Sequence, residues 1–317
     1  MFENSIAYDI LISMIKKHTH SGVTWVDLES PSQTEIKQVM KEFNLHPLVA
    51  EELLVPTLKP KVELFENYIY LILHFPALMR GARIDPPKEV DFVIGRNFII
   101  TSRFATVEPI MNFSKIFETN SILEKGAEKA HAGLIFYYMI KKLYRHSMFE
   151  LEKIRVKLCD VENMIFEGKE KEMVVELSKY SRELLDFKQI LGTHIETLES
   201  FEIHASKILG EEFNSNINAI LGEYKKVCSD IVSDREFLSD LRETNDSLLN
   251  TKQNETMKIL TIMAFVTFPL SLITDLFSMN TAHSPIVGLP YDFEIIMVIM
   301  FIVAFIMFGL FKFKKWL

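Results

Sequence analysis

Cysteine is scarce in this sequence of 317 residues, and its pattern argues against a disulfide framework. Cys159 and Cys228 lie far apart and neither has a CxxC partner, so a thiolate metal site is not indicated either. We therefore expect two buried free thiols. Glycine-rich phosphate loops, nucleophile elbows and HExxH motifs are also missing, so no feature of the sequence indicates an enzyme.

Basic residues are outnumbered by acidic ones, and the formal net charge is −8. Only five of the 35 Lys and Arg residues and four of the 43 Asp and Glu residues lie from Lys252 onward, so the acidic excess belongs to the preceding body. Such a body argues against nucleic acid as a partner and is compatible with divalent cations. Residues 1–17 lack the pattern of a signal peptide, and we expect none.

Two stretches near the C-terminus lack charge altogether, residues 259–274 and 295–311. A membrane-spanning helix needs about 17–25 residues, so we predict spans at about 258–279 and 293–313, joined by a loop at about 280–292. The alternative is a buried helical hairpin of a soluble protein. The remaining chain, however, offers little to cover two helices that are apolar all round.

The segment between the two stretches lacks lysine and arginine from residue 278 to 292. By contrast, Lys252 and Lys258 precede the first stretch, and Lys312, Lys314 and Lys315 follow the second. The positive-inside rule then predicts a multi-pass protein of the cell (inner) membrane with both termini in the cytoplasm and the loop outside.

Residues 1–126 have the texture of a cytoplasmic α/β domain. The sequence Ser30-Pro31-Ser32-Gln33 predicts a capping box, with Pro31 at the first helical position and Gln33 reaching back. Alternating and continuous apolar runs predict strands at Val23–Leu28, Tyr68–Phe75, Glu89–Ile94 and Asn97–Ser102. We therefore expect an α+β domain that precedes the helical part of the chain.

Residues 127–257 are predicted to form a stalk of long helices, because apolar residues recur there at spacings of three and four. Proline is absent between Pro109 and Pro269. That absence permits one continuous helix from about residue 211 through the first span, some 65 residues long. A helix of this length usually packs against copies of itself.

Small and polar side chains form one stripe on the membrane end of this long helix. Its spacings alternate between three and four, and its members are Asn254, Met257, Thr261, Ala264, Phe268, Ser271, Asp275 and Ser278. Such a stripe is either tightly packed or lines water. A carboxylate within the membrane favours an aqueous path, although Asp275 near the outer end could instead reach the interface. Thr267 and Thr274 lie off the stripe and can bond backbone within the helix.

If several copies surround an axis, the stripe supplies rings of side chains with different chemistry. Met257 and Phe268 suit a hydrophobic constriction, whereas Asp275 would concentrate cations. Magnesium gives up its water reluctantly, so oxygen ligands would hold the hydrated ion.

Several motifs resemble the CorA-type divalent cation transporters. They are Asn254–Ile262, Pro269, the Met279-Asn280 pair, Trp25–Leu28, Lys61–Tyr68 and Asn97–Thr101. The resemblance covers nearly the whole chain. It implies a funnel-shaped homopentamer with an α+β cytoplasmic domain, a long helical stalk and two C-terminal transmembrane helices, whose pore is lined by the first span.

The resemblance also implies that the cargo is Mg²⁺, and often Co²⁺ or Ni²⁺, moved down its electrochemical gradient. Mg²⁺ would then be substrate and regulator, with no separate cofactor. The family signature is Gly-Met-Asn, which stands here as Ser278-Met279-Asn280. Asn280 carries over as a contact to the hydrated ion and Asn254 as the inner asparagine of the pore. Asp275 stands where the family commonly has glycine.

Two alternatives stay open. A ZntB-like Zn²⁺ transporter coupled to protons is suggested by Ser278 and by His283 in the predicted loop, and a non-conducting scaffold or metal sensor by the lost glycine. The regulatory metal site cannot be assigned by motif. Acids available for it are Asp85, Glu89, Asp91, Asp230 and Asp234, for which solvated surface positions are the simpler expectation. His18, His20, His194 and His204 are expected to be ordinary surface or core histidines.

Overall fold

The computed structural model describes residues 15–77, 86–118, 131–279, 286, 288 and 290–314. The chain divides into two compact units, one of residues 1–167 and 173–241 and the other of residues 168–172 and 242–317. The elements in chain order are β1 Lys16–His20, β2 Val23–Glu29, α1 Gln33–Phe43, α2 Pro47–Glu52, β3 Lys61–Leu64, β4 Tyr68–Phe75, β5 Lys88–Gly95, β6 Phe98–Arg103, α3 Glu108–Glu118, α4 Ala132–Phe166, α5 Glu170–Gly192, α6 His194–Leu209, the 3₁₀ turn Glu211–Phe213, α7 Asn214–Ser278 and α8 Asp292–Phe313.

The first unit is built on a six-stranded sheet in the order β1-β2-β6-β5-β4-β3. The pair β2–β6 is parallel and the other pairs are antiparallel. The four predicted strands are present as β2, β4, β5 and β6, whereas β1 and β3 at the two edges were not predicted. Both edge strands are short and carry charged or half-exposed residues, which weakens the hydrophobic signal on which such predictions rest.

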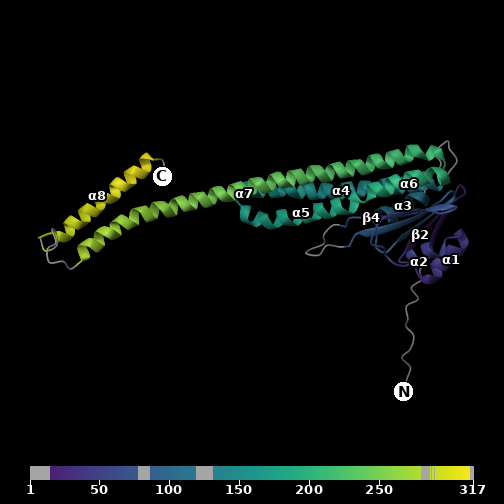
Figure 1. Cartoon of the computed structure of the whole chain (residues 1–317), viewed down its shortest axis with the longest axis horizontal. Coiled ribbons are helices and arrows are strands. Elements are labelled where there is room, and N and C mark those ends of the chain that lie inside the picture. Colours follow the sequence, from purple (N-terminus) through teal and green to yellow (C-terminus); the bar gives the residue numbers. More distant parts are fainter. Residues whose placement is uncertain are drawn as a thin grey trace, which may run out of the picture. The chain divides into compact units, whose positions relative to one another are not determined.

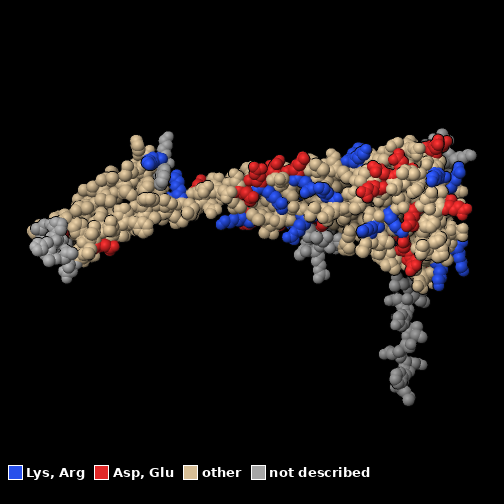
Figure 2. Space-filling model, viewed as in Figure 1, with Lys and Arg blue, Asp and Glu red and all other residues tan. Residues whose placement is uncertain are grey.

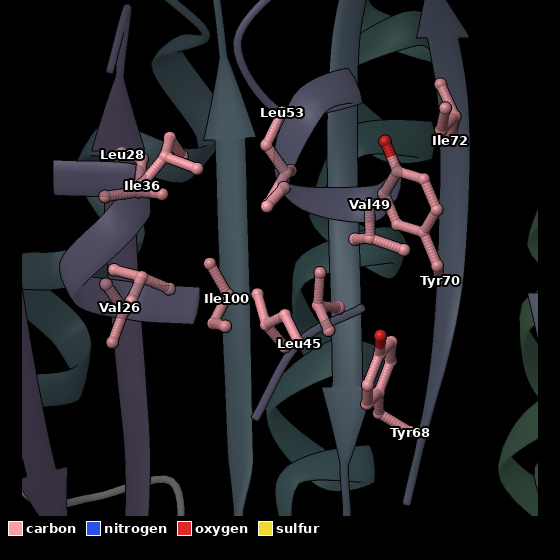
Figure 3. Close-up of a cluster of buried hydrophobic side chains, with 13 residues drawn as sticks. Val26, Leu28, Ile36, Leu45, Val49, Leu53, Tyr68, Tyr70, Ile72 and Ile100 are labelled. Atoms are coloured by element: carbon pink, nitrogen blue, oxygen red, sulfur yellow. The ribbon is translucent and has the colours of Figure 1, made fainter. Parts of the chain in front are cut away.

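Helices α1 and α2 cover one face of the sheet, and Figure 3 shows the apolar side chains between these helices and the strands. Helix α1 begins with a capping box, but its cap is Ser32 and its partner is Glu35. The predicted box from Ser30 to Gln33 was therefore wrong. The reason is that Pro31 precedes the cap. The Ser32 hydroxyl accepts a hydrogen bond from the Glu35 N–H, and the Glu35 carboxylate accepts one from the Ser32 N–H.

Helices α4 and α6 cover the opposite face of the sheet (Figure 1). Phe92 of β5 packs edge-to-face on Phe136 of α4, which in turn contacts Phe201 of α6. His194 is fully buried at the start of α6; its Nδ1 lies 2.9 Å from the Tyr144 hydroxyl and its Nε2 2.8 Å from the His74 carbonyl. Burial lowers the pKa of His194 to about 4, so the ring is neutral and its Nε2–H donates to the carbonyl. The expectation of a core histidine is confirmed.

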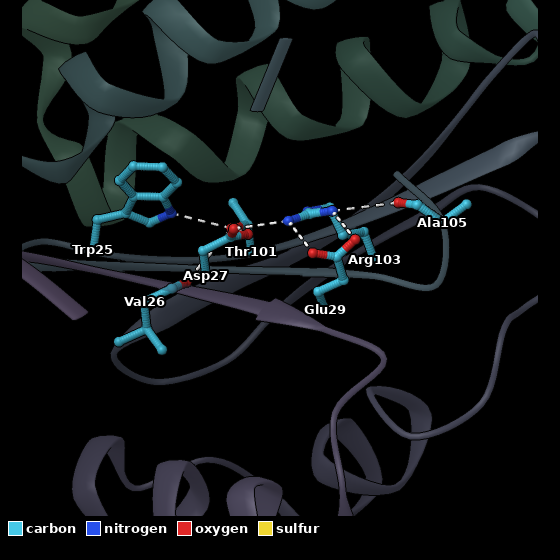
Figure 4. A network of polar contacts seen from close by, with 7 residues as sticks. All are labelled: Trp25, Val26, Asp27, Glu29, Thr101, Arg103 and Ala105. Atoms are coloured by element: carbon cyan, nitrogen blue, oxygen red, sulfur yellow. Dashed lines mark hydrogen bonds and ion pairs between the residues drawn. The ribbon is translucent and has the colours of Figure 1, made fainter. Parts of the chain in front are cut away.

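A buried polar network also lies on this face and crosses the parallel pair β2–β6 (Figure 4). Arg103 is fully buried and bonds Asp27 at 3.1 Å and Glu29 at 2.8 Å. Thr101 donates to Asp27 at 2.8 Å and accepts from the Trp25 indole at 3.0 Å. Because each group is matched to one across the strand pair, the network favours one register of β2 against β6.

The long helices behave as the sequence indicated. Helix α7 runs without a break over 65 residues, which confirms the predicted continuous helix. The leucines at positions 177, 184, 191 and 198 are buried, although a break at residue 193 places the last of them on α6. Both cysteines are free, but the expectation that they are buried was wrong: Cys159 is exposed and Cys228 is intermediate.

Asp234 is an acid on the buried side of α7 and is 2% exposed. Arg155 of α4 lies 3.8 Å from its Oδ1, which accepts no hydrogen bond. Burial raises the pKa of Asp234 to about 6, since Arg155 only partly offsets the desolvation and the nearby Asp230 and Glu152 oppose ionisation. Ionisation of Asp234 near neutral pH therefore works against the helical packing.

We expect Arg103→Leu to destabilise the protein by about 3–5 kcal/mol, because it leaves the Asp27 carboxylate buried without its cation. Adding Asp27→Asn should recover most of that loss. Thermal unfolding of the detergent-solubilised full chain measures both effects, and Arg96→Leu, at an exposed position, is the matched control. If Arg103→Leu were as stable as the control Arg96→Leu, the network would contribute nothing to stability.

We expect Asp234→Asn to stabilise the protein at alkaline pH and to leave it unchanged at acidic pH. The folded-state pKa of Asp234 is raised, so the wild type loses stability as pH rises through about 6, whereas the asparagine variant does not. The gain above that pH should be on the order of 1–3 kcal/mol. Unfolding curves recorded across pH, with exposed Asp240→Asn as control, test this; parallel curves for all three proteins would refute it.

Candidate functional site

The C-terminal part of α7 and the whole of α8 are apolar and uncovered in the single chain. Mean hydropathy reaches 1.9 in an 18-residue window of α7 and 2.8 in α8, and 0% of either window is buried. Figure 2 shows that charged side chains are abundant on the first unit and sparse on these two helices. Such surfaces are suited to lipid or to other apolar helices.

All eight stripe residues lie on α7, so their spacing of three and four places them on one face of a single helix. Met257 is 55% exposed and Phe268 is 72% exposed. On another side of α7, the Thr274 hydroxyl lies 3.9 Å from the Met300 sulfur of α8. Successive residues differ by roughly 100° around a helix, so this contact leaves the face that carries Asp275 open.

The hydroxyl groups of this helix end mostly bond to its own backbone. Thr267 donates to the Met263 carbonyl at 2.8 Å and Thr274 to the Leu270 carbonyl at 2.9 Å, which confirms the expectation for these two off-stripe residues. Thr261, which is on the stripe, does the same to Met257 at 2.7 Å. These bonds hide donors that would be costly in an apolar surrounding.

Ser278 is the last residue of α7, and its hydroxyl donates to the Asp275 carbonyl at 2.9 Å. Its backbone is helical, so a residue with a side chain is accommodated here without left-handed angles. Met279 follows and is 58% exposed. Asn280 and His283 lie outside the described residues, as do most positions of the predicted outer loop.

The second helix begins close to its predicted position. Asp292 is the first residue of α8, and its carboxylate accepts hydrogen bonds from the Gly288 N–H at 3.1 Å and from the Phe293 N–H at 2.8 Å. The Asp292 carboxylate thus satisfies the Phe293 N–H in the first turn, whereas the N-cap residue Tyr291 makes no side-chain cap bond.

Just before the stripe, Lys252 ties α7 to the turn between α4 and α5. Its ammonium bonds the Glu170 carboxylate at 2.6 Å and the Gly168 carbonyl at 3.3 Å. This hydrogen bond lowers the pKa of Glu170 and keeps it ionised. The sequence showed Lys252 only as a positive flank, because the partner lies 82 positions away.

Acids proposed from the sequence as solvated turn out differently. Glu89 is 6% exposed, Asp91 0% and Asp234 2%, so that expectation was wrong for all three, while Asp85 lies outside the described residues. The sequence could have indicated that Glu89 and Asp91 are buried, since both interrupt an otherwise apolar strand. Across the described residues, no group of three or more His, Cys, Asp or Glu side chains is placed to hold a metal ion.

Comparisons with known proteins agree over almost the full length. The chain is 26% identical over 307 residues to the cobalt/magnesium transport protein CorA of Thermotoga maritima, covering 96% of this chain and 86% of that protein. The CorA magnesium transporter structure from Methanocaldococcus jannaschii matches with a TM-score of 0.81 at 20% identity, covering 93% of this chain and 92% of that one.

A cytoplasmic domain of ZntB from Vibrio parahaemolyticus matches less well, with a TM-score of 0.56 at 13% identity over 73% of this chain and 88% of that domain. The family described as CorA-like Mg²⁺ transporter protein matches residues 20–315. The α+β domain, the long helix, the two apolar C-terminal helices and this match together show that the chain belongs to the CorA-like Mg²⁺ transporter family.

Proposed function

We propose that the protein conducts divalent cations, Mg²⁺ foremost, through a pore formed by the stripe of α7 in a homopentamer. The observation that carries this proposal is the exposed face of α7, on which eight small, polar or large apolar residues recur at spacings of three and four. A carboxylate and hydroxyls on an otherwise apolar helix are stabilised when several copies enclose water between them.

The chemistry of the stripe fits a hydrated cation. Asp275 and the outer residues Ser278, Met279 and Asn280 would form the mouth, where carboxylate, amide and carbonyl oxygens bind an ion that keeps its water. Further in, Phe268 and Met257 would make apolar rings that close the path by dewetting, and Asn254 would form its inner end. Ser271, Ala264 and Thr261 would line the space between them. The ion is cargo and, in this proposal, also regulator, and no other cofactor is required.

The orientation proposed is both termini in the cytoplasm of a cell whose inner membrane holds α8 and the end of α7. Lys252 and Lys258 before the first span and Lys312 and Lys314 at the end of the second support it, because basic residues are retained on the cytoplasmic side. The apolar surface of both helices would face lipid wherever it does not face another copy.

Ion flux into liposomes tests the proposal directly. With the purified protein reconstituted, we expect voltage-driven Mg²⁺ flux that is indifferent to an inward proton gradient. Asn280→Ala should reduce that flux at least tenfold, because it removes an oxygen ligand at the mouth. Normal flux in Asn280→Ala would refute the pore assignment. Zn²⁺ flux that rises with the proton gradient would support the ZntB-like alternative. Absence of both Mg²⁺ and Zn²⁺ flux would support a non-conducting scaffold.

Asp275→Gly should change ion affinity or selectivity more than it changes folding. Removing a ring of carboxylates weakens the attraction for divalent ions, so the Mg²⁺ concentration for half-maximal flux should rise several-fold. Flux titrations give this value, and Thr274→Ala, one position off the stripe, is the control. Superimposable titrations for Asp275→Gly and the wild type would remove Asp275 from the ion path.

A further inference from the structure

Two buried acids lie side by side on strand β5 of the first unit. Glu89 and Asp91 are two residues apart and so point to the same face of the sheet. Asp91 pairs with Ile72 across β4, and Ile72 belongs to the cluster under α1 and α2, so both acids lie on that face. Carboxyl groups are rarely buried this fully without a reason that can be identified.

Glu89 has the partners that a buried carboxylate needs. One oxygen accepts the Thr57 N–H at 2.7 Å and the other accepts the Thr57 hydroxyl at 3.1 Å. The His74 Nε2 lies 3.0 Å from the Thr57 carbonyl and 3.3 Å from the Glu89 carboxyl. The two Thr57 donors offset part of the loss of water that burial imposes on Glu89. They also hold the segment between α2 and β3 against the sheet.

Asp91 has no such donors. Neither carboxyl oxygen has a hydrogen-bond partner, and the groups that act on its pKa include the Glu89 carboxyl and the Tyr70 phenol. The Tyr70 hydroxyl and the Ser102 hydroxyl, the latter on the residue paired with Asp91 across β6, are likewise buried without partners. A bare carboxylate in this setting would cost several kcal/mol.

The charges around Asp91 add to this cost. Lys61 of β3 is engaged by Glu52 of α2 at 2.6 Å and by Glu63 at 3.1 Å, so its charge is already balanced. His74 of β4 faces Glu89 and not Asp91. Burial, together with the negative charges of Glu89 and Glu52, raises the pKa of Asp91 well above its usual value.

We propose that Glu89 and Asp91 form a proton-binding site, in which the Asp91 carboxyl carries one proton and its O–H donates a hydrogen bond to the Glu89 carboxylate. A single proton taken from water then supplies the hydrogen-bond donor and the positive charge that the Asp91 carboxylate lacks. The Asp91 hydroxyl bonds Glu89, the Tyr70 hydroxyl can donate to the remaining Asp91 oxygen, and one negative charge is left on the pair. A metal ion is not needed.

Loss of the proton would place two negative charges on neighbouring positions of one strand face. The repulsion would disturb Glu89 and with it the bonds to Thr57. The proton therefore keeps the segment between α2 and β3 in place, and the Thr57 N–H reports whether it is bound. Leu53 at the start of this stretch is fully buried, whereas Leu58, the residue after Thr57, is 98% exposed, so Thr57 anchors the exposed part of the stretch.

Infrared spectroscopy of the detergent-solubilised full chain tests the protonation itself. A protonated carboxyl group has its own carbonyl band, and at neutral pH we expect Asp91→Asn to lack one such band that the wild type shows. Exposed Asp240→Asn should leave the band unchanged. Identical spectra for the wild type and Asp91→Asn would mean that Asp91 is ionised, and the proposal would fail.

Amide hydrogen exchange at Thr57 tests the consequence. After correction for intrinsic rates, wild-type protection should fall as pH rises through the raised pKa of Asp91, because Asp91 loses its proton there. Asp91→Asn should keep its protection throughout. Equal pH dependence in both proteins would overturn the link to Thr57.

Glu89→Gln covers the case in which Asp91→Asn does not fold. This variant removes the nearest negative charge, so the carboxyl band of Asp91 should disappear at a lower pH than in the wild type. A band that titrates at the same pH in both proteins would show that the proton is not shared. A band abolished by adding Mg²⁺ at constant pH would show a metal site in place of the proton site.

Discussion

The long helix α7 depends on keeping its backbone hydrogen bonds through its apolar C-terminal part, which is suited to a membrane. In hydrocarbon every unpaired N–H or C=O costs several kcal/mol, so the 65-residue helix must satisfy its groups internally. Pro269 is the exception, because it has no N–H to offer the carbonyl of Phe265 one turn earlier. The missing hydrogen bond falls next to Phe268, the residue proposed for an apolar ring. Nearby threonines bond backbone carbonyls and limit the number of exposed polar groups.

The α+β domain places its two polar clusters on opposite faces of one sheet, and the clusters differ in how their charge is satisfied. Under α4 and α6, Arg103 supplies a cation to Asp27 and Glu29. Under α1 and α2, Asp91 has no cation, and a proton is the simplest group that completes its environment. Asp27 and Asp91 lie on different strands of the same sheet and both are buried, but only Asp27 has a counter-charge beside it.

Prediction from sequence succeeded where the signal was local and periodic. The strand Tyr68–Phe75, the continuous helix through residue 278 and the start of α8 all follow from runs of apolar residues or from the lack of proline. It failed where the decision was between neighbours, as with Ser32 instead of Ser30 as the helix cap, or where a short edge strand had little hydrophobic content. It also failed for burial of single polar groups, since Asp91 and Cys159 were assigned the wrong surroundings.

By itself the sequence determined four strands of the sheet, the two apolar helices, and the stripe that runs from Asn254 to Ser278. Helical spacing alone places those eight residues on one face, whatever the rest of the chain does. Only the tertiary structure decided which charges are paired. Lys252 with Glu170, Arg103 with Asp27 and Asp91 without a cation depend on contacts between residues that lie far apart in sequence, and no local pattern encodes such contacts.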